Sequence, residues 1–85
     1  MKTKKASSKI KIKITAVGYL KTYINNKEEK TSQVAKGSSI HKALSSLKIP
    51  ADEVMMVTVN GKHASKDDIL QDNDHIKLIP LMGGG

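Results

Sequence analysis

Residues 55–64 read MMVTVNGKHA, and this stretch decides the fold. Apolar side chains recur at every second position, which is the period of a strand with one buried face. The Asn60-Gly61 pair favours a type I′ turn, because both central residues of that turn need a positive φ. The stretch therefore predicts a β-hairpin whose core positions are Met55, Val57 and Val59. Met56 would then face the solvent.

The residues before this hairpin predict two further strands. Isoleucines at positions 10, 12 and 14 alternate with lysines at positions 9, 11 and 13, which is typical of a half-buried strand with its lysines in water. Residues 18–30 contain Asn25-Asn26 and two glutamates, and they predict a loop or a wide hairpin connection. Residues 31–36 predict a weaker strand that depends on Val34.

A short amphipathic helix is predicted between the two groups of strands. The spacing i, i+3, i+4, i+7 of one apolar helix face is met by Ile40, Ala43, Leu44 and Leu47. The preceding Gly37-Ser38-Ser39 offers a hydroxyl as the helix N-cap. Pro50 disfavours a continued helix, so the helix should end near Lys48.

A tight turn is predicted after the 55–64 hairpin. Ile69 and Leu70 predict a short helical turn or a plug in the core. Asp72-Asn73-Asp74 then predicts the turn itself, in which Asn73 adopts the left-handed conformation.

The last predicted strand covers residues 75–80, with Ile76 and Leu78 on one face and Ile79 on the other. Two hairpins that flank a helix predict an α+β fold, in which one sheet carries the helix on one face. We expect one domain over residues 9–80. Residues 1–8 would form a disordered basic tail, and residues 81–85 a flexible C-terminal tail.

The C-terminal tail reads LMGGG and ends in three consecutive glycines. Glycine has no Cβ, so such a run is thin and can pass where other residues cannot. A terminal carboxylate presented in this way suits insertion into the active site of another protein. The plain alternative is a frayed terminus or a linker scar.

Composition excludes several classes of function. The chain has 85 residues, too few for a complete enzyme built around a deep pocket, and it has no cysteine. Its net charge is +7, and all fifteen basic residues are lysines. Without Arg, Phe or Trp, sequence-specific nucleic-acid binding is disfavoured, and most lysines are read as solvated. The longest apolar stretch is residues 54–57, far short of a membrane span, so a cytoplasmic location is the default expectation.

No residues form a recognisable catalytic or metal site. The three histidines, His41, His63 and His75, do not have the spacing of zinc ligands. The aspartates near the C-terminus lack the glycine and glutamate of a calcium loop. The chain also lacks a phosphate-binding glycine loop, so it could not activate its own carboxylate with ATP.

Three motifs together resemble the MoaD/ThiS family of small sulfur carriers. They are Val57-Thr58-Val59-Asn60-Gly61-Lys62, then Leu70-x-Asp72-Asn73-Asp74-x-Ile76, and Ile79-Pro80-Leu81 with the terminal glycines. The resemblance covers residues 10–85. It departs from the family at Asn73, where the family usually has glycine, and in having three terminal glycines rather than two.

The resemblance implies a ubiquitin-like β-grasp fold, a mixed sheet of four to five strands in which the first and last strands are parallel central neighbours. It also implies a protein co-substrate rather than an enzyme. A ubiquitin-activating-type enzyme would use ATP to adenylate the C-terminal glycine, which becomes a thiocarboxylate and donates sulfur in molybdopterin or thiamine biosynthesis. No cofactor would be bound by this chain. The further partners would be a sulfur donor protein or a sulfur-accepting synthase subunit.

Two alternatives use the same fold. One is a ubiquitin-like modifier whose terminus is conjugated to a lysine. The other is a noncatalytic interaction or RNA-binding module.

The resemblance and the exposed apolar positions together assign candidate site residues. Gly85 would carry the acyl adenylate and the thiocarboxylate, or Gly84 if the tail is trimmed. The part of the tail inserted into the partner would be Leu81, Met82, Gly83 and Gly84. The partner-binding residues would be Met56, Ile79 and Pro80, with a basic rim at Lys11, Lys13 and Lys77.

Overall fold

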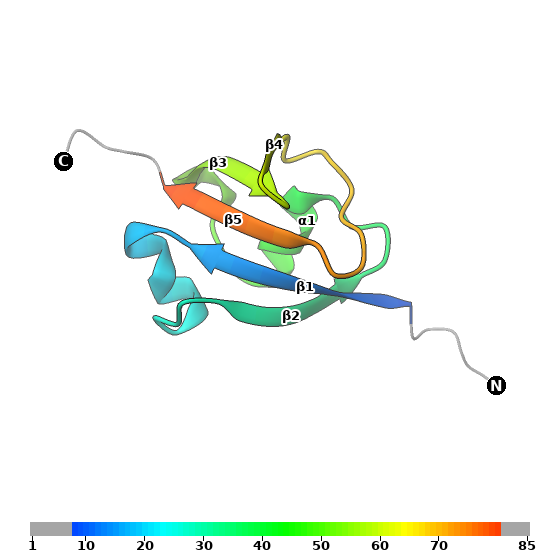
Figure 1. Ribbon diagram of the computed structural model, residues 1–85, viewed down its shortest axis with the longest axis horizontal. Coiled ribbons are helices and arrows are strands. Elements are labelled where there is room, and N and C mark those ends of the chain that lie inside the picture. The colour runs from blue at the N-terminus through cyan, green and yellow to red at the C-terminus, as the bar shows by residue number, and fades with distance from the viewer. Residues whose placement is uncertain (1–7, 81–85) are drawn as a thin grey trace.

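The structure is a computed structural model that describes residues 8–80 (Figure 1). Five strands form one mixed sheet in the order β2-β1-β5-β3-β4, and one short α-helix packs across a single face. The elements are β1 (Lys9–Ala16), η2 (Gly18–Ile24), β2 (Lys30–Ala35), α1 (Ile40–Ser46), η3 (Ala51–Glu53), β3 (Val54–Val59), β4 (Lys62–Ala64) and β5 (His75–Pro80). The predicted α+β architecture is confirmed.

The first and last strands lie side by side at the centre of the sheet and run parallel. Their register pairs Ile14 with Ile76, so both isoleucines point to the same buried face. The other three pairings, β1 with β2, β3 with β5 and β3 with β4, are antiparallel. Because β1 and β5 are parallel, the start of β1 and the end of β5 lie at opposite ends of the sheet (Figure 1).

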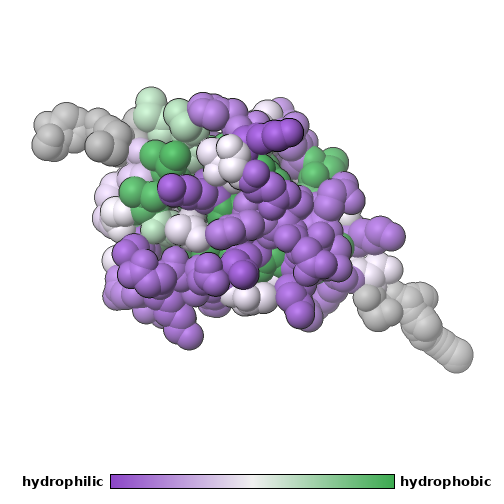
Figure 2. Space-filling view, viewed as in Figure 1, coloured by the Kyte–Doolittle hydropathy of each residue, from purple (hydrophilic) through white to green (hydrophobic). Residues whose placement is uncertain are grey.

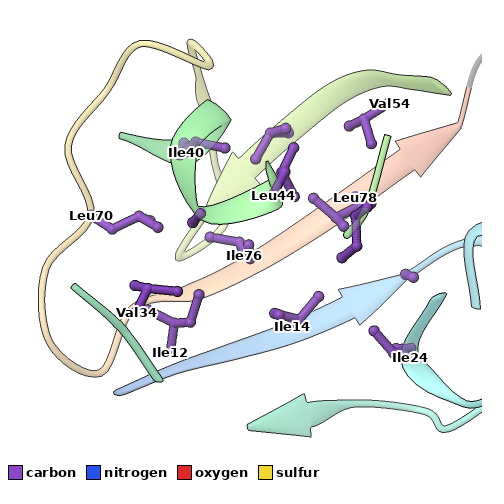
Figure 3. Close-up of a cluster of buried hydrophobic side chains, with 14 of the residues drawn as sticks. Ile12, Ile14, Ile24, Val34, Ile40, Leu44, Val54, Leu70, Ile76 and Leu78 are labelled. Atoms are coloured by element: carbon purple, nitrogen blue, oxygen red, sulfur yellow. The ribbon is translucent and has the colours of Figure 1, made fainter. Parts of the chain in front are cut away.

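The core lies between the sheet and α1 (Figure 3). Ile40, Ala43 and Leu44 of the helix are fully buried, as the helical spacing predicts, and Leu47 is partly buried. The helix begins where expected, because the Ser39 hydroxyl accepts a hydrogen bond from the Lys42 amide at 3.1 Å. The sheet contributes the alternating apolar residues of β1 and β5.

Residues 18–30 connect the antiparallel strands β1 and β2, as the predicted wide hairpin connection requires, but the first half of the segment is not a loop. Residues Gly18–Ile24 form the 3-10 helix η2, which buries Leu20 and Ile24 in the core. With about three residues per turn, Leu20 and the partly buried Tyr23 lie on one side of this 3-10 helix, and Ile24 follows directly. These apolar residues were the only sign of structure in the segment, and the polar residues around them obscured it.

Two apolar residues predicted to be buried are exposed. Met55 is 61% exposed, because the pairing of β3 with β5 shifts between Val54 and Met56. A β-bulge of this kind moves one side chain out of alternation, and Val54 takes the core position instead. Ile69 is 52% exposed, and the backbone there forms an isolated bridge with Ser39 rather than a helical turn. Leu70 alone is the predicted core plug.

Both predicted turns are confirmed, and they are hydrogen bonded to each other. Asn60 and Gly61 have φ values of 53° and 87°, and Asn73 has a φ of 70°. The Asn60 side-chain amide donates to Asp74 Oδ1 at 2.9 Å, and the Gln71 amide donates to Asp74 Oδ2 at 2.8 Å. The buried Asp74 carboxylate therefore joins the hairpin to the start of β5, which holds β5 in register.

A second polar contact joins the two 3-10 helices. The Tyr23 hydroxyl donates to Glu53 Oε1 at 3.1 Å. This hydrogen bond, with desolvation and the negative charge of Glu53, raises the pKa of Tyr23 above its ordinary value of 10.0. The contact fixes η2 against η3 and thus orders the chain on both sides of the end of β5.

Candidate functional site

The candidate site surrounds the end of β5, from which the glycine tail continues. The Val17 amide donates to the Leu78 carbonyl at 3.0 Å, so residues 17–18 lie along one side of the strand. On the other side, β3 pairs Val54 with Pro80 and Met56 with Ile79. The last described residues of the chain are therefore held from both sides by backbone pairing.

Gly18 allows the close approach on the first side. It has a φ of +60°, which favours glycine, and a Cβ placed on it would lie 3.5 Å from Pro80 Cγ. That separation is ordinary van der Waals contact, so the need for glycine comes from the backbone conformation. Pro80 itself is buried. As the buried last residue of β5, it offers no exposed surface to a partner, contrary to the sequence-based expectation.

Exposed apolar side chains gather around this end of the sheet (Figure 2). We define the exit patch as the half-buried Ile79 together with Val17, Tyr19, Met55 and Met56. Within residues 8–80, these four exposed residues and Ile69 are the only large apolar side chains that are exposed. Such a concentration near one end of a small domain is typical of a protein-binding surface.

The structure brings together some of the predicted partner-binding residues. Met56 is 37% exposed and is the cross-strand neighbour of Ile79, so these two form one contact surface. Sequence reasoning missed Val17, Tyr19 and Met55. The predicted tail residues Leu81, Met82, Gly83, Gly84 and Gly85 lie outside the described residues, and so does the basic segment 1–7.

A basic surface continues from the exit patch across the open face of the sheet. Lys11, Lys13 and Lys77 are all exposed, as the alternation in β1 and β5 predicts. The Lys13 ammonium lies 3.5 Å from Glu29 Oε2, a solvent-exposed pair of the kind that contributes little to stability. Lys11 and Lys77 form no ion pair with a described carboxylate.

The described residues offer no metal centre. The three histidines stand on α1, β4 and β5, and no group of three His, Asp or Glu side chains converges within residues 8–80. In the same range, no helix is both long enough and apolar enough to cross a bilayer.

Comparison with known proteins places this fold. The chain is 18% identical to a Pyrococcus furiosus protein named as molybdopterin converting factor subunit 1, over 84% of this chain and 97% of that one, with a TM-score of 0.66. It is 17% identical to small archaeal modifier protein 1 of Haloferax volcanii, over 84% and 97% of the two chains, with a TM-score of 0.68. It is also 17% identical to Urm1 from Trypanosoma brucei, over 93% and 99%, with a TM-score of 0.68.

These likenesses show the ubiquitin-like β-grasp fold. No curated protein sequence matches the chain. The ThiS family profile matches residues 17–85, which include η2, all five residues of the exit patch and the terminal glycines. The chain belongs to the ThiS family of small ubiquitin-like proteins.

Proposed function

We propose that this protein is a sulfur carrier, a protein co-substrate whose C-terminal glycine carboxylate is adenylated by a partner enzyme and converted to a thiocarboxylate. The sulfur would enter a cofactor of the molybdopterin or thiamine type, in the cytoplasm. The observation that carries the proposal is the family match over residues 17–85, because it extends to the terminal glycines. The exit patch supports it, since a reactive tail needs a docking surface beside it.

The reaction divides into two substitutions. A carboxylate oxygen of the terminal glycine first attacks the α-phosphorus of ATP, and pyrophosphate leaves. A hydrosulfide ion then attacks the acyl carbon, the C–O bond to the phosphate breaks, AMP leaves, and the thiocarboxylate remains with release of a proton. Activation is necessary because the negative charge of a carboxylate repels nucleophiles. The partner would supply ATP, magnesium and the catalytic groups, and this chain would supply the carboxylate and the docking surface.

Docking would use the exit patch. Ile79 and Met56 are neighbours across β5 and β3, so a partner that covers one of them covers both. The exposed lysines of the open face would increase the rate of encounter with an acidic partner. Pro80 would act indirectly, by keeping the tail in line with β5.

We predict that Ile79→Asp weakens binding to the adenylating enzyme by at least about tenfold, which corresponds to about 1.4 kcal/mol. The carboxylate would be buried against an apolar surface in the complex. Ile69→Asp is the control, because Ile69 is an exposed isoleucine that precedes the turn at the opposite end of β5. Calorimetric titration with each variant measures the effect. Equal affinity of the two variants, or unfolding of Ile79→Asp alone, would place the docking surface elsewhere.

The adenylation step can be tested by pyrophosphate exchange. Purified adenylating enzyme should incorporate labelled pyrophosphate into ATP only when this protein is present. Exchange that is independent of this protein would contradict the proposal.

A ubiquitin-like modifier is the second candidate. It is favoured by the structural likeness to the Haloferax volcanii protein, whose name describes a modifier. Both candidates share the adenylation step, and they differ in the acceptor. Covalent adducts of this protein on target lysines, detected as a ladder after denaturing electrophoresis, would support the modifier. A chain that carries the terminal thiocarboxylate but forms no adduct with a lysine would support the sulfur carrier.

A further inference from the structure

Three side chains form a row across the middle of the open face. Thr15 of β1 and Lys77 of β5 are paired in register, and Lys77 is also paired with Thr58 of β3. Directly opposed residues in a sheet point to the same face, so the lysine stands between two threonines. Lys77 is exposed and both threonines are half-buried. With Gly61 and His75, these residues line a hollow of about 310 Å³.

The hollow is held by a rigid frame. The His75 amide donates to Asn60 Oδ1 at 3.0 Å, and the Asn60 amide donates to the His75 carbonyl at 2.8 Å. The His75 imidazole Nε2 shares a hydrogen bond with the Thr15 hydroxyl at 2.7 Å. The Thr15 and His75 side chains and the 60–61 turn are thus fixed before any ligand arrives, which reduces the entropy lost on binding.

The chemistry of the lining selects an anion. The hollow offers one ammonium group and two hydroxyl groups, and none of the residues that line it is acidic. None of the lining residues is an arginine, which would bind a phosphate through two bonds, and the one aromatic ring in the lining, the His75 imidazole, is hydrogen bonded to Thr15. A single carboxylate matches this set of donors better than a polyphosphate or a nucleic acid does.

The position of the hollow points to the source of the carboxylate. Lys77 and Ile79 are on the same face of β5, two residues apart, which separates them by about 6.7 Å along the strand. A protein that docks on Ile79 and Met56 therefore also covers Lys77. We propose that an aspartate or glutamate side chain of the adenylating enzyme inserts into this hollow beside its apolar contact with the exit patch. This inference rests on the proposed function and adds a charged anchor to it.

The test is a kinetic comparison of lysine variants in the adenylation assay. Lys77→Gln should raise the KM for this protein by about tenfold or more and leave kcat unchanged, because a charge-assisted hydrogen bond is lost only in the complex. Lys77→Arg keeps the positive charge and should stay within about threefold of the wild type, and Thr58→Val should raise KM about threefold. Lys9→Gln is the control, since Lys9 is exposed on the same sheet but is paired with β2.

The outcomes separate the two proposals. Equal KM values for Lys77→Gln and Lys9→Gln, with normal adenylation of the wild type, overturn the carboxylate anchor alone. If the adenylating enzyme does not adenylate the wild-type protein at all, the proposed function and the anchor are overturned together. An affinity for RNA that depends on Lys77, with an unchanged KM, would assign the hollow to a polyanion and also overturn the anchor. Urea midpoints within error of the wild type exclude a general folding defect.

Discussion

Removal of Gly84 and Gly85 together is expected to abolish adenylation while the free energy of unfolding stays unchanged. The last described strand, β5, ends at Pro80, and all the core residues of the described range precede Gly84 and Gly85. The deletion therefore removes none of these core residues. The carboxylate would move back by two residues, or about 7 Å for an extended chain. A displacement of about 1 Å from the reactive geometry already costs about a hundredfold in rate. Pyrophosphate exchange should therefore fall to background.

Deletion of Gly85 alone is the informative companion to the double deletion. Retained activity would identify Gly84 as the residue that reacts after trimming, and lost activity would identify Gly85. Urea denaturation of both variants verifies that the fold is intact. Exchange at the wild-type rate in the double deletion would contradict the carrier function.

Leu44→Ala is expected to lower the free energy of unfolding by about 2–5 kcal/mol. Leu44 is fully buried at the centre of the helix–sheet interface (Figure 3), so the substitution leaves a cavity under β5. A domain of this length has a total stability of roughly 4–13 kcal/mol, and the variant would thus lose a large part of it.

Chemical denaturation measures this loss, with Ser45→Ala as the control. Ser45 follows Leu44 in α1 but is exposed, and its replacement should change stability by less than about 0.5 kcal/mol. A denaturation midpoint for Leu44→Ala equal to that of Ser45→Ala would show that the helix does not pack through this face.

Local patterns predicted most of the fold, because they depend on neighbouring residues. The period of two in β1, the Asn60-Gly61 turn and the apolar spacing in α1 each identify an element directly. The incorrect predictions concern positions whose burial is determined by tertiary packing. The bulge at Met55 is set by the pairing of β3 with β5, and a shift of one residue reverses the face of a side chain.

The candidate site was predictable only in part, for the same reason. Ile79 and Met56 follow from alternation within their own strands. Val17 and Tyr19 join the exit patch because Gly18 turns the chain against the end of β5, a contact between distant parts of the sequence. The Thr15–Lys77–Thr58 row likewise requires the parallel pairing of the first and last strands.

The central claim is that the terminal carboxylate accepts sulfur, and intact-mass spectrometry tests it most directly. The protein would be incubated with ATP, the adenylating enzyme and sulfide, and fragmentation would then locate any change. The account predicts a gain of about 16 Da, the exchange of one oxygen for sulfur by acyl substitution, confined to the terminal glycine. An unchanged mass in a reaction that consumes ATP, or a change located elsewhere in the chain, would contradict it.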